Sequence, residues 1–249
     1  MAVVIRTADF KDNDRMLTLL TRQHGLMSAK ARGAKKQTGK LFFASSLFCC
    51  GEYTFYEKNG FFGVKGAHVK YRFGHLQADY DAYAAACFIA DVCGKVAQED
   101  YAAPKLFALT VNALYALDTG AAHVETALCY FVQRLLQIEG LFPELNACAY
   151  CGSEEGLTSF SIEHDGVVCH DCAPKGDSQF VGERLIGALD AMRPVLPVDI
   201  ADVDIPETER EKLADLLIAV LEYALQTPLK TTAFVKACRA DALRADSPK

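Results

Sequence analysis

The first 75 residues alternate short apolar runs with turn-forming residues, as strand-rich regions do. Residues 3–7 are mostly β-branched, residues 16–21 set methionine and leucine beside threonine, and residues 26–34 follow a turn at residues 23–25. Short runs of this kind, bounded by turn residues, predict three strands.

Two aromatic-rich runs follow, at residues 42–56 and 61–73. Between them stands Glu57-Lys58-Asn59-Gly60, and an Asn-Gly pair between apolar runs is a strong hairpin signal. Five strands in so short a stretch fit a small closed barrel of the OB type. We therefore predict a five-stranded OB-fold barrel over residues 1–78.

After His75 the pattern changes to alanine-rich segments with apolar residues three and four positions apart. This spacing predicts helices at residues 79–96, 104–117, 124–138, 182–192, 207–225 and 229–240. Asp79 and Pro104 are helix-start signals, and Gly140 is a stop signal. The prediction is an α+β protein in which the barrel precedes an all-helical domain at residues 79–249.

Two cysteine pairs interrupt the helical pattern, Cys148 with Cys151 and Cys169 with Cys172, separated by seventeen residues. Two Cys-x2-Cys pairs at this distance can present four sulfurs to one tetrahedral ion. The spacing therefore predicts a zinc knuckle at residues 146–174, with one structural Zn²⁺ per chain. Four unrelated thiols and two disulfides are the competing interpretations.

The N-terminus shows no secretion pattern, since its short apolar run is broken at once by Arg6, and residues 82–90 fall far short of the roughly 20 apolar residues of a membrane span. We therefore expect a cytoplasmic protein. In that reducing compartment the remaining cysteines are expected to be buried apolar residues. These are Cys49, Cys50, Cys87, Cys93, Cys129 and Cys238.

The net charge of −6 conceals a strong asymmetry. Residues 1–78 hold 13 Lys and Arg against 5 Asp and Glu, a charge of +8, whereas residues 79–249 carry −14. Such a division indicates that one part of the chain meets a polyanion and the other does not. The acidic composition of the whole chain therefore does not exclude nucleic-acid binding.

A cluster of cations ends the third predicted strand and continues into the loop beyond it. Five of the residues from 30 to 40 are cationic and none is acidic: Lys30, Arg32, Lys35, Lys36 and Lys40. Such a loop can follow a phosphate backbone, with binding that weakens as salt rises. Composition alone fits an ordinary solvated loop equally well, but the barrel context favours binding, because OB barrels commonly bind single strands in cationic grooves.

Aromatic residues of the predicted strands are candidate platforms for stacking bases. They are Phe42, Phe43, Tyr53, Phe55, Tyr56, Phe61, Phe62, Tyr71 and Phe73. We expect most of these rings to belong to the core, because a barrel this small is filled by its own inward-facing side chains.

Common catalytic signatures are missing from the sequence: there is no G-x-x-x-x-G-K-[ST], G-x-G-x-x-G, H-E-x-x-H or G-x-S-x-G segment. Four thiolates would also leave a zinc ion no open coordination position for catalysis. The residues therefore favour a binding protein over an enzyme. An RNA-binding or transcription-associated module and a hydrolase with structural zinc are the alternatives.

A series of short motifs is spread along nearly the whole chain. They are Val3-Val-Ile-Arg, Asn13-Asp14-Arg15, Leu17-Thr-Leu-Leu-Thr, His24-Gly25-Leu26, Ala31-Arg32-Gly33-Ala34, Gly140-Leu-Phe-Pro143, the two Cys-x2-Cys pairs and Pro228-Leu229-Lys230. Together they resemble the RecO family of bacterial recombination mediators.

The resemblance implies an N-terminal OB domain that binds single- and double-stranded DNA and a protein that anneals complementary strands. It also implies work with RecR, and in some bacteria RecF, to place RecA on DNA coated by single-strand-binding protein, whose acidic C-terminal tail is a further partner. The family's basic patch falls on Arg15, Lys30, Arg32, Lys35, Lys36 and Lys40, and its zinc ligands on the four paired cysteines. Arg134, on the third predicted helix, is a candidate contact for the acidic tail, although a lone helix charge usually faces water.

Overall fold

The structure, a computed structural model, describes residues 1–175 and 177–245. It separates into two compact units: Met1–Gly120 with the C-terminal segment from Ala233 onward, and Ala121–Thr232. The predicted change from strands to helices falls between β5 and α1, but the first unit includes helices as well as the barrel. Whether residue 78 marks a boundary between domains stays a prediction.

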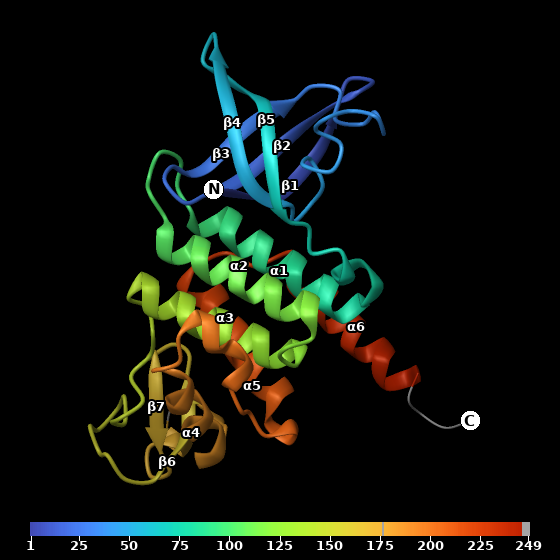
Figure 1. The fold of residues 1–249 in the computed structure, drawn as a ribbon. Helices are drawn as coiled ribbons and strands as arrows, with labels where there is room; N and C mark the ends of the chain where they lie inside the picture. Colours follow the sequence, from blue (N-terminus) through green and yellow to red (C-terminus); the bar gives the residue numbers. More distant parts are fainter. Residues whose placement is uncertain (176, 246–249) are drawn as a thin grey trace. The chain divides into compact units, whose positions relative to one another are not determined.

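The N-terminal strands close into a barrel, as predicted (Figure 1). The strands are β1 (Ala2–Phe10), β2 (Asp14–Thr21), β3 (Gly25–Ala31), β4 (Cys50–Lys58) and β5 (Phe61–Tyr71). Their order around the barrel is β1-β2-β3-β5-β4, with β4 pairing antiparallel to β1 and β3 pairing parallel to β5. This is the five-stranded OB-type barrel that the apolar pattern indicated.

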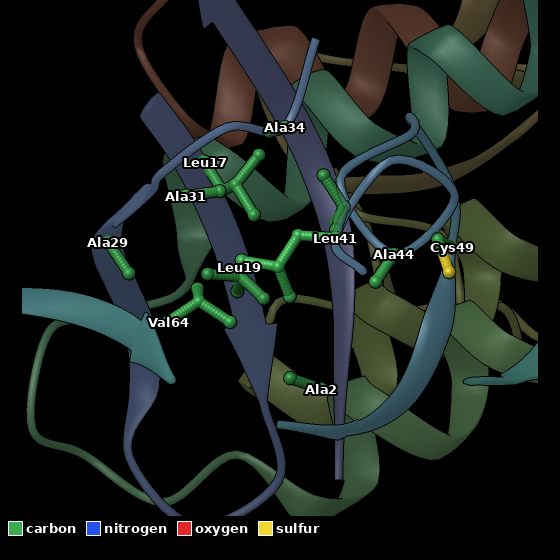
Figure 2. Close-up of a cluster of buried hydrophobic side chains, with 11 residues drawn as sticks. Ala2, Leu17, Leu19, Ala29, Ala31, Ala34, Leu41, Ala44, Cys49 and Val64 are labelled. Atoms are coloured by element: carbon green, nitrogen blue, oxygen red, sulfur yellow. The ribbon is translucent and has the colours of Figure 1, made fainter. Parts of the chain in front are cut away.

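The barrel core is made of small and aliphatic side chains (Figure 2). The strands supply most of them, and the segment between β3 and β4, residues 32–49, supplies Ala34, Leu41, Ala44 and Cys49. We call this segment the connection. Because its apolar side chains are buried in the barrel core, the connection is a fixed part of the fold.

The connection also corrects two predicted strand limits. The run at residues 26–34 leaves the strand after Ala31, and the run at residues 42–56 becomes a strand only at Cys50. Turns occupy residues 32–48, with Phe42 N–H donating to the Gly39 carbonyl at 3.0 Å and Phe48 at a φ of 64°. Such turns cannot pair in a ladder, although their composition resembles that of the strand that follows.

The helices of the first unit are η1 (His75–Ala78), α1 (Tyr80–Val96), α2 (Pro104–Thr119) and, from its second residue, α6 (Thr232–Ala245). Asp79 caps α1 by accepting from the backbone N–H groups of Asp81 and Ala82, and Pro104 begins α2. Both predicted start signals are therefore confirmed. In Figure 1, α1 and α2 run side by side beneath the barrel.

The second unit contains the remaining helices and a small sheet. Its elements are α3 (Val124–Glu139), β6 (Leu157–Ser161), β7 (Gly166–Cys169), η2 (Ala173–Lys175), β8 (Gln179–Phe180), α4 (Glu183–Met192), η3 (Pro197–Asp202) and α5 (Glu207–Ala224). Helix α3 ends at Gly140, whose φ of 71° allows the left-handed cap, and packs on α5. The three-stranded sheet, in the order β7-β6-β8, accompanies the predicted helices.

Among the residues that the structure describes, no helix combines the length and the apolar character that crossing a membrane requires.

Candidate nucleic-acid interface and metal site

The predicted DNA-binding cations lie on β2, β3 and the connection. Arg15 belongs to β2 and Lys30 to β3, whereas Arg32, Lys35, Lys36 and Lys40 belong to the connection. Buried Ala34 and Leu41 fix the connection in the barrel core on either side of Lys35, Lys36 and Lys40. These three cations are thus carried by an anchored segment instead of a free loop.

Three of the six cations are held by carboxylates of the first two strands. Lys35 Nζ lies 2.8 Å and Arg15 Nε 3.9 Å from the Asp9 carboxylate. Lys30 Nζ lies 2.9 Å from Asp14 Oδ2. Asp14 also accepts from the Gly33 backbone N–H at 2.9 Å, so that its carboxylate fixes the start of the connection.

These contacts favour the charged form of both carboxyl groups. The hydrogen bond from Lys35 is the main cause that lowers the pKa of Asp9, and the Gly33 N–H followed by Lys30 lowers the pKa of Asp14. Arg15 further donates to Ser45 Oγ at 3.2 Å and so ties β2 to the connection. Arg15, Lys30 and Lys35 therefore have structural partners already.

The other three cations, Arg32, Lys36 and Lys40, are exposed. Within residues 1–175 and 177–245, no carboxylate lies within 4.0 Å of their charged nitrogen atoms. Cations exposed in this way can contact phosphates without first breaking an ion pair. The structure thus divides the predicted patch into three partnered and three outward-facing cations.

The expectation that most of the candidate rings belong to the core is wrong. Phe73 alone among the nine is buried, and Phe43, Phe61, Phe62 and Tyr71 are exposed. The reason is that aliphatic side chains and the connection already fill the narrow interior, so that Tyr53 and Phe55 pack only at its margin. Several rings therefore stay accessible on the barrel surface.

Asp9, Asp14 and Phe10 are site residues that sequence reasoning missed. A signal for Asp9 and Arg15 was present, because a tight turn at residues 11–13 pairs Asp9 with Arg15 across the β1–β2 hairpin. Phe10 ends β1 beside that turn, with Lys30 Nζ 4.6 Å from its ring centroid. This contact joins residues that are twenty positions apart, and no local pattern indicates it.

The four paired cysteines come together in the second unit. The Sγ atoms of Cys148, Cys151, Cys169 and Cys172 all lie within 4.8 Å of one another, and the Cys151 and Cys169 sulfurs are 3.8 Å apart. Sulfurs bound at about 2.3 Å to a tetrahedral ion would themselves be about 3.8 Å apart. The cluster therefore has the dimensions of a four-thiolate metal site, and all four cysteines are free thiols.

Turns bring backbone N–H groups toward these sulfurs. The Cys169 N–H lies 3.3 Å from Cys148 Sγ, and Gly152, with a φ of 75°, completes the turn after the first pair. Burial opposes ionisation of Cys148, but the N–H groups of Cys169, Cys151 and Tyr150 outweigh it and lower its pKa to about 6. Hydrogen bonds to Cys151 and Cys169 raise the pKa of Cys172 to about 12.

A bound cation would change the protonation of the whole cluster. Close sulfurs cannot all ionise without a nearby positive charge, and a metal ion supplies that charge. His170 does not belong to the sulfur cluster, because its side chain is 68% exposed and its Nε2 lies 3.0 Å from Asp171 Oδ1. The residues present therefore fit a metal ion with four sulfur ligands.

Arg134 lies half-buried on α3, neither fully exposed nor in the core. It donates to Gln137 Oε1 at 2.7 Å and to the Arg193 carbonyl at 3.2 Å. The Arg193 guanidinium in turn lies 5.8 Å from the Phe142 ring centroid. The structure thus adds a second arginine and an aromatic ring beside the predicted tail contact.

Comparison with known proteins identifies both parts of the chain. Residues 1–73 match the family model described as "Recombination protein O N terminal", and residues 77–233 match "Recombination protein O C terminal". Proteins named "DNA repair protein RecO" are 33% identical in Bacillus velezensis and 30% identical in Bacillus subtilis and Listeria welshimeri. Each alignment spans 174 residues, which is 70% of this chain and 68% of the relative. The barrel, the cysteine cluster and these two matches together show that the chain belongs to the RecO family.

Proposed function

We propose that this protein is a non-catalytic recombination mediator that binds single- and double-stranded DNA on its barrel and anneals complementary strands. The observation that carries this proposal is the outward-facing set of Arg32, Lys36 and Lys40 on a segment anchored in the barrel core. Membership of a family whose relatives are named DNA repair proteins supports the same reading. The site is electrostatic and has little means of reading a base sequence.

The mechanism is partial neutralisation of the phosphate backbone. Two DNA strands repel each other through their phosphates, and cations that contact one strand reduce this repulsion as the complementary strand approaches. The bases themselves then supply the free energy of pairing. Each phosphate contact releases counterions, so that DNA affinity falls steeply as salt rises.

The proposed metal ion is zinc, one per chain, held by Cys148, Cys151, Cys169 and Cys172 with a structural role. Four thiolates are a common ligand set for structural zinc and leave no position for a reacting water. The buried cluster around the sulfurs is small: Cys148, Val168 and Cys169 form it, with Leu157, Cys172 and Ala173 packed against it. A metal ion that joins the four sulfurs would therefore add to the stability of this segment.

Partner proteins complete the proposed role. Together with RecR, and with RecF where it is used, the protein places RecA on DNA that is coated by single-strand-binding protein. The acidic tail of that coating protein binds near Arg134 and Arg193, whose guanidinium groups can accept its carboxylates. We expect this activity in the cytoplasm, at the nucleoid.

The test is annealing of complementary strands precoated with single-strand-binding protein, measured with and without RecR. The expected result is annealing above the spontaneous rate, which depends on this protein and is changed by RecR. A variant in which Lys36 and Lys40 become glutamate should anneal more slowly, whereas the Lys95→Glu/Lys105→Glu variant should keep the wild-type rate. Annealing no faster than without protein, together with tight RNA binding, would favour the RNA-binding alternative.

A further inference from the structure

A groove of about 600 Å³ lies on the barrel, lined by β2, β3 and the turns that join β1 to β2 and β4 to β5. Its aromatic and cationic lining residues are Phe10, Lys11, Lys30, Phe61 and Phe62, which we call the aromatic face. In OB-type barrels the surface of the second and third strands and these two turns commonly binds oligonucleotides. The groove thus occupies a favourable place for a nucleic-acid strand.

The rings of the aromatic face are unusually accessible. Phe61 is 78% exposed, and Phe10 and Phe62 are each 37% exposed. Phe61 stands directly after the turn at Asn59 and Gly60, where the φ values of 53° and 76° form the tight hairpin. Exposed rings that gather in one groove mark a binding surface, because each keeps apolar area in water unless a partner covers it.

Cations border the same rings. Lys30 Nζ lies 4.6 Å and Lys11 Nζ 5.7 Å from the centroid of the Phe10 ring. Glu99 and Asp100, from the segment between α1 and α2, also line the groove. The groove therefore offers rings for bases, cations for phosphates near Phe10, and acidic groups from which phosphates are repelled.

The combination of rings and cations selects for unpaired bases. Within a duplex the base faces are already stacked on each other, whereas a single strand can turn its bases onto aromatic side chains. A peptide of apolar residues would use the rings but not the lysines, and duplex DNA would use the lysines but not the rings. Single-stranded DNA uses both.

We propose that the aromatic face binds the unpaired bases of single-stranded DNA, with Phe61 as a stacking platform and Lys11 beside the phosphates, while Lys30 keeps its ion pair with Asp14. This inference rests on the proposed DNA binding of the barrel and deepens it. The connection contacts phosphates of either single or double strands. The aromatic face gives the barrel its preference for a strand that is not yet paired, and Lys30 belongs to both surfaces.

The test compares three DNA probes with the full-length protein: a ten-nucleotide oligothymidine, an abasic strand of equal length and charge, and a ten-base-pair duplex. For the Phe61→Ala variant we expect about tenfold weaker binding of oligothymidine and unchanged binding of the other two probes. The matched control is Phe180→Ala, because Phe180 is 79% exposed and lies on β8 of the other compact unit. This control should bind all three probes as the wild type does.

Several outcomes would overturn the inference. One such outcome is wild-type protein that binds oligothymidine no more tightly than the abasic strand, and another is Phe61→Ala binding all three probes equally more weakly than the wild type. Either result would rule out base stacking but leave phosphate binding by the connection intact. Loss of binding to RecR by Phe61→Ala, with all DNA affinities unchanged, would make the groove a protein interface. A wild-type protein that binds none of the probes would contradict the proposed function itself.

Discussion

The connection and the cysteine segment are both irregular stretches between regular elements, but they direct their side chains in opposite ways. In the connection, Ala34 and Leu41 lie in the barrel core while Lys36 and Lys40 face solvent. In the segment at residues 146–174, the reactive groups themselves converge, with four sulfurs within 4.8 Å of one another. The connection thus exposes its charged groups to solvent, whereas the segment at residues 146–174 encloses its sulfur atoms.

Under the proposed function, this difference separates a surface that binds DNA from a site that stabilises the fold. The outward-facing cations give up little interaction energy when they contact a phosphate, because no ion pair needs to break first. Four converging thiolates have no ligand position left for a partner, and their removal affects the segment that they join. Perturbing the two regions should therefore produce opposite patterns of stability and DNA affinity.

The largest effect is expected from removing a sulfur ligand. The Cys151→Ser variant should lose nearly all of its metal and destabilise the second unit by about 4 kcal/mol or more, because metal binding and local folding are coupled. Metal analysis of freshly purified protein should give about one zinc per chain in the wild type. Thermal unfolding then reports the change in stability.

The matched control for this change is Cys87→Ser, since Cys87 is half-buried on α1 and lies outside the sulfur cluster. It should keep its zinc, and both variants should bind DNA within about twofold of the wild type where the barrel is folded. Wild-type protein without metal, or Cys151→Ser with a full complement of it, would refute the metal site.

An intermediate effect is expected from reversing the charge of the outward cations. The Lys36→Glu/Lys40→Glu variant should bind single-stranded DNA about 10- to 100-fold more weakly at ~0.1 M salt, with a salt slope lower by about 1.4, because two phosphate contacts are lost. Fluorescence anisotropy of a labelled oligonucleotide across a salt series measures both quantities. The unfolding temperature should change little, since both lysines are exposed.

The control carries the same change of net charge on exposed helical lysines of the same compact unit, Lys95→Glu with Lys105→Glu. If that variant lost as much affinity and as much salt slope as Lys36→Glu/Lys40→Glu, binding would follow net charge alone and the connection would have no special role.

The smallest effect is expected from releasing a partnered cation. The Asp9→Asn variant removes the carboxylate that lies 2.8 Å from Lys35 Nζ, and so should raise DNA affinity about two- to threefold at low salt. The gain should disappear in high salt, where exposed charges are screened. Asp190→Asn, which removes a carboxylate paired with Arg193 in the other unit, serves as the control and should leave affinity unchanged.

Regular elements could be predicted from the sequence because their signals are local. The Asn59-Gly60 turn, the Asp79 cap and the spacing of the four cysteines each act over a few residues, and the structure contains all three features. The limits of the connection could not be predicted this way. Its apolar residues from Leu41 onward, broken only by Ser45 and Ser46, continue into β4, and only packing inside the barrel shows that Leu41 and Ala44 precede the strand.

The division of the basic patch was also beyond local patterns. Lys30 meets Asp14 and Lys35 meets Asp9 across strands and turns, through pairings that depend on the barrel's register. The sequence shows which residues of the patch are cationic, but it does not show which of them form ion pairs and which face solvent. The accessible rings were misjudged for a similar reason, because their burial depends on how much of the interior the connection fills.

Hydrogen–deuterium exchange of the full-length protein, with and without saturating single-stranded oligonucleotide, tests whether the barrel binds DNA. DNA should slow exchange in residues 9–15 and 30–49, which carry the cations and their carboxylate partners. Exchange in residues 146–174 should be unaffected by DNA. Protection confined to residues 121–232, with no change in the barrel, would contradict the claim that the barrel binds DNA.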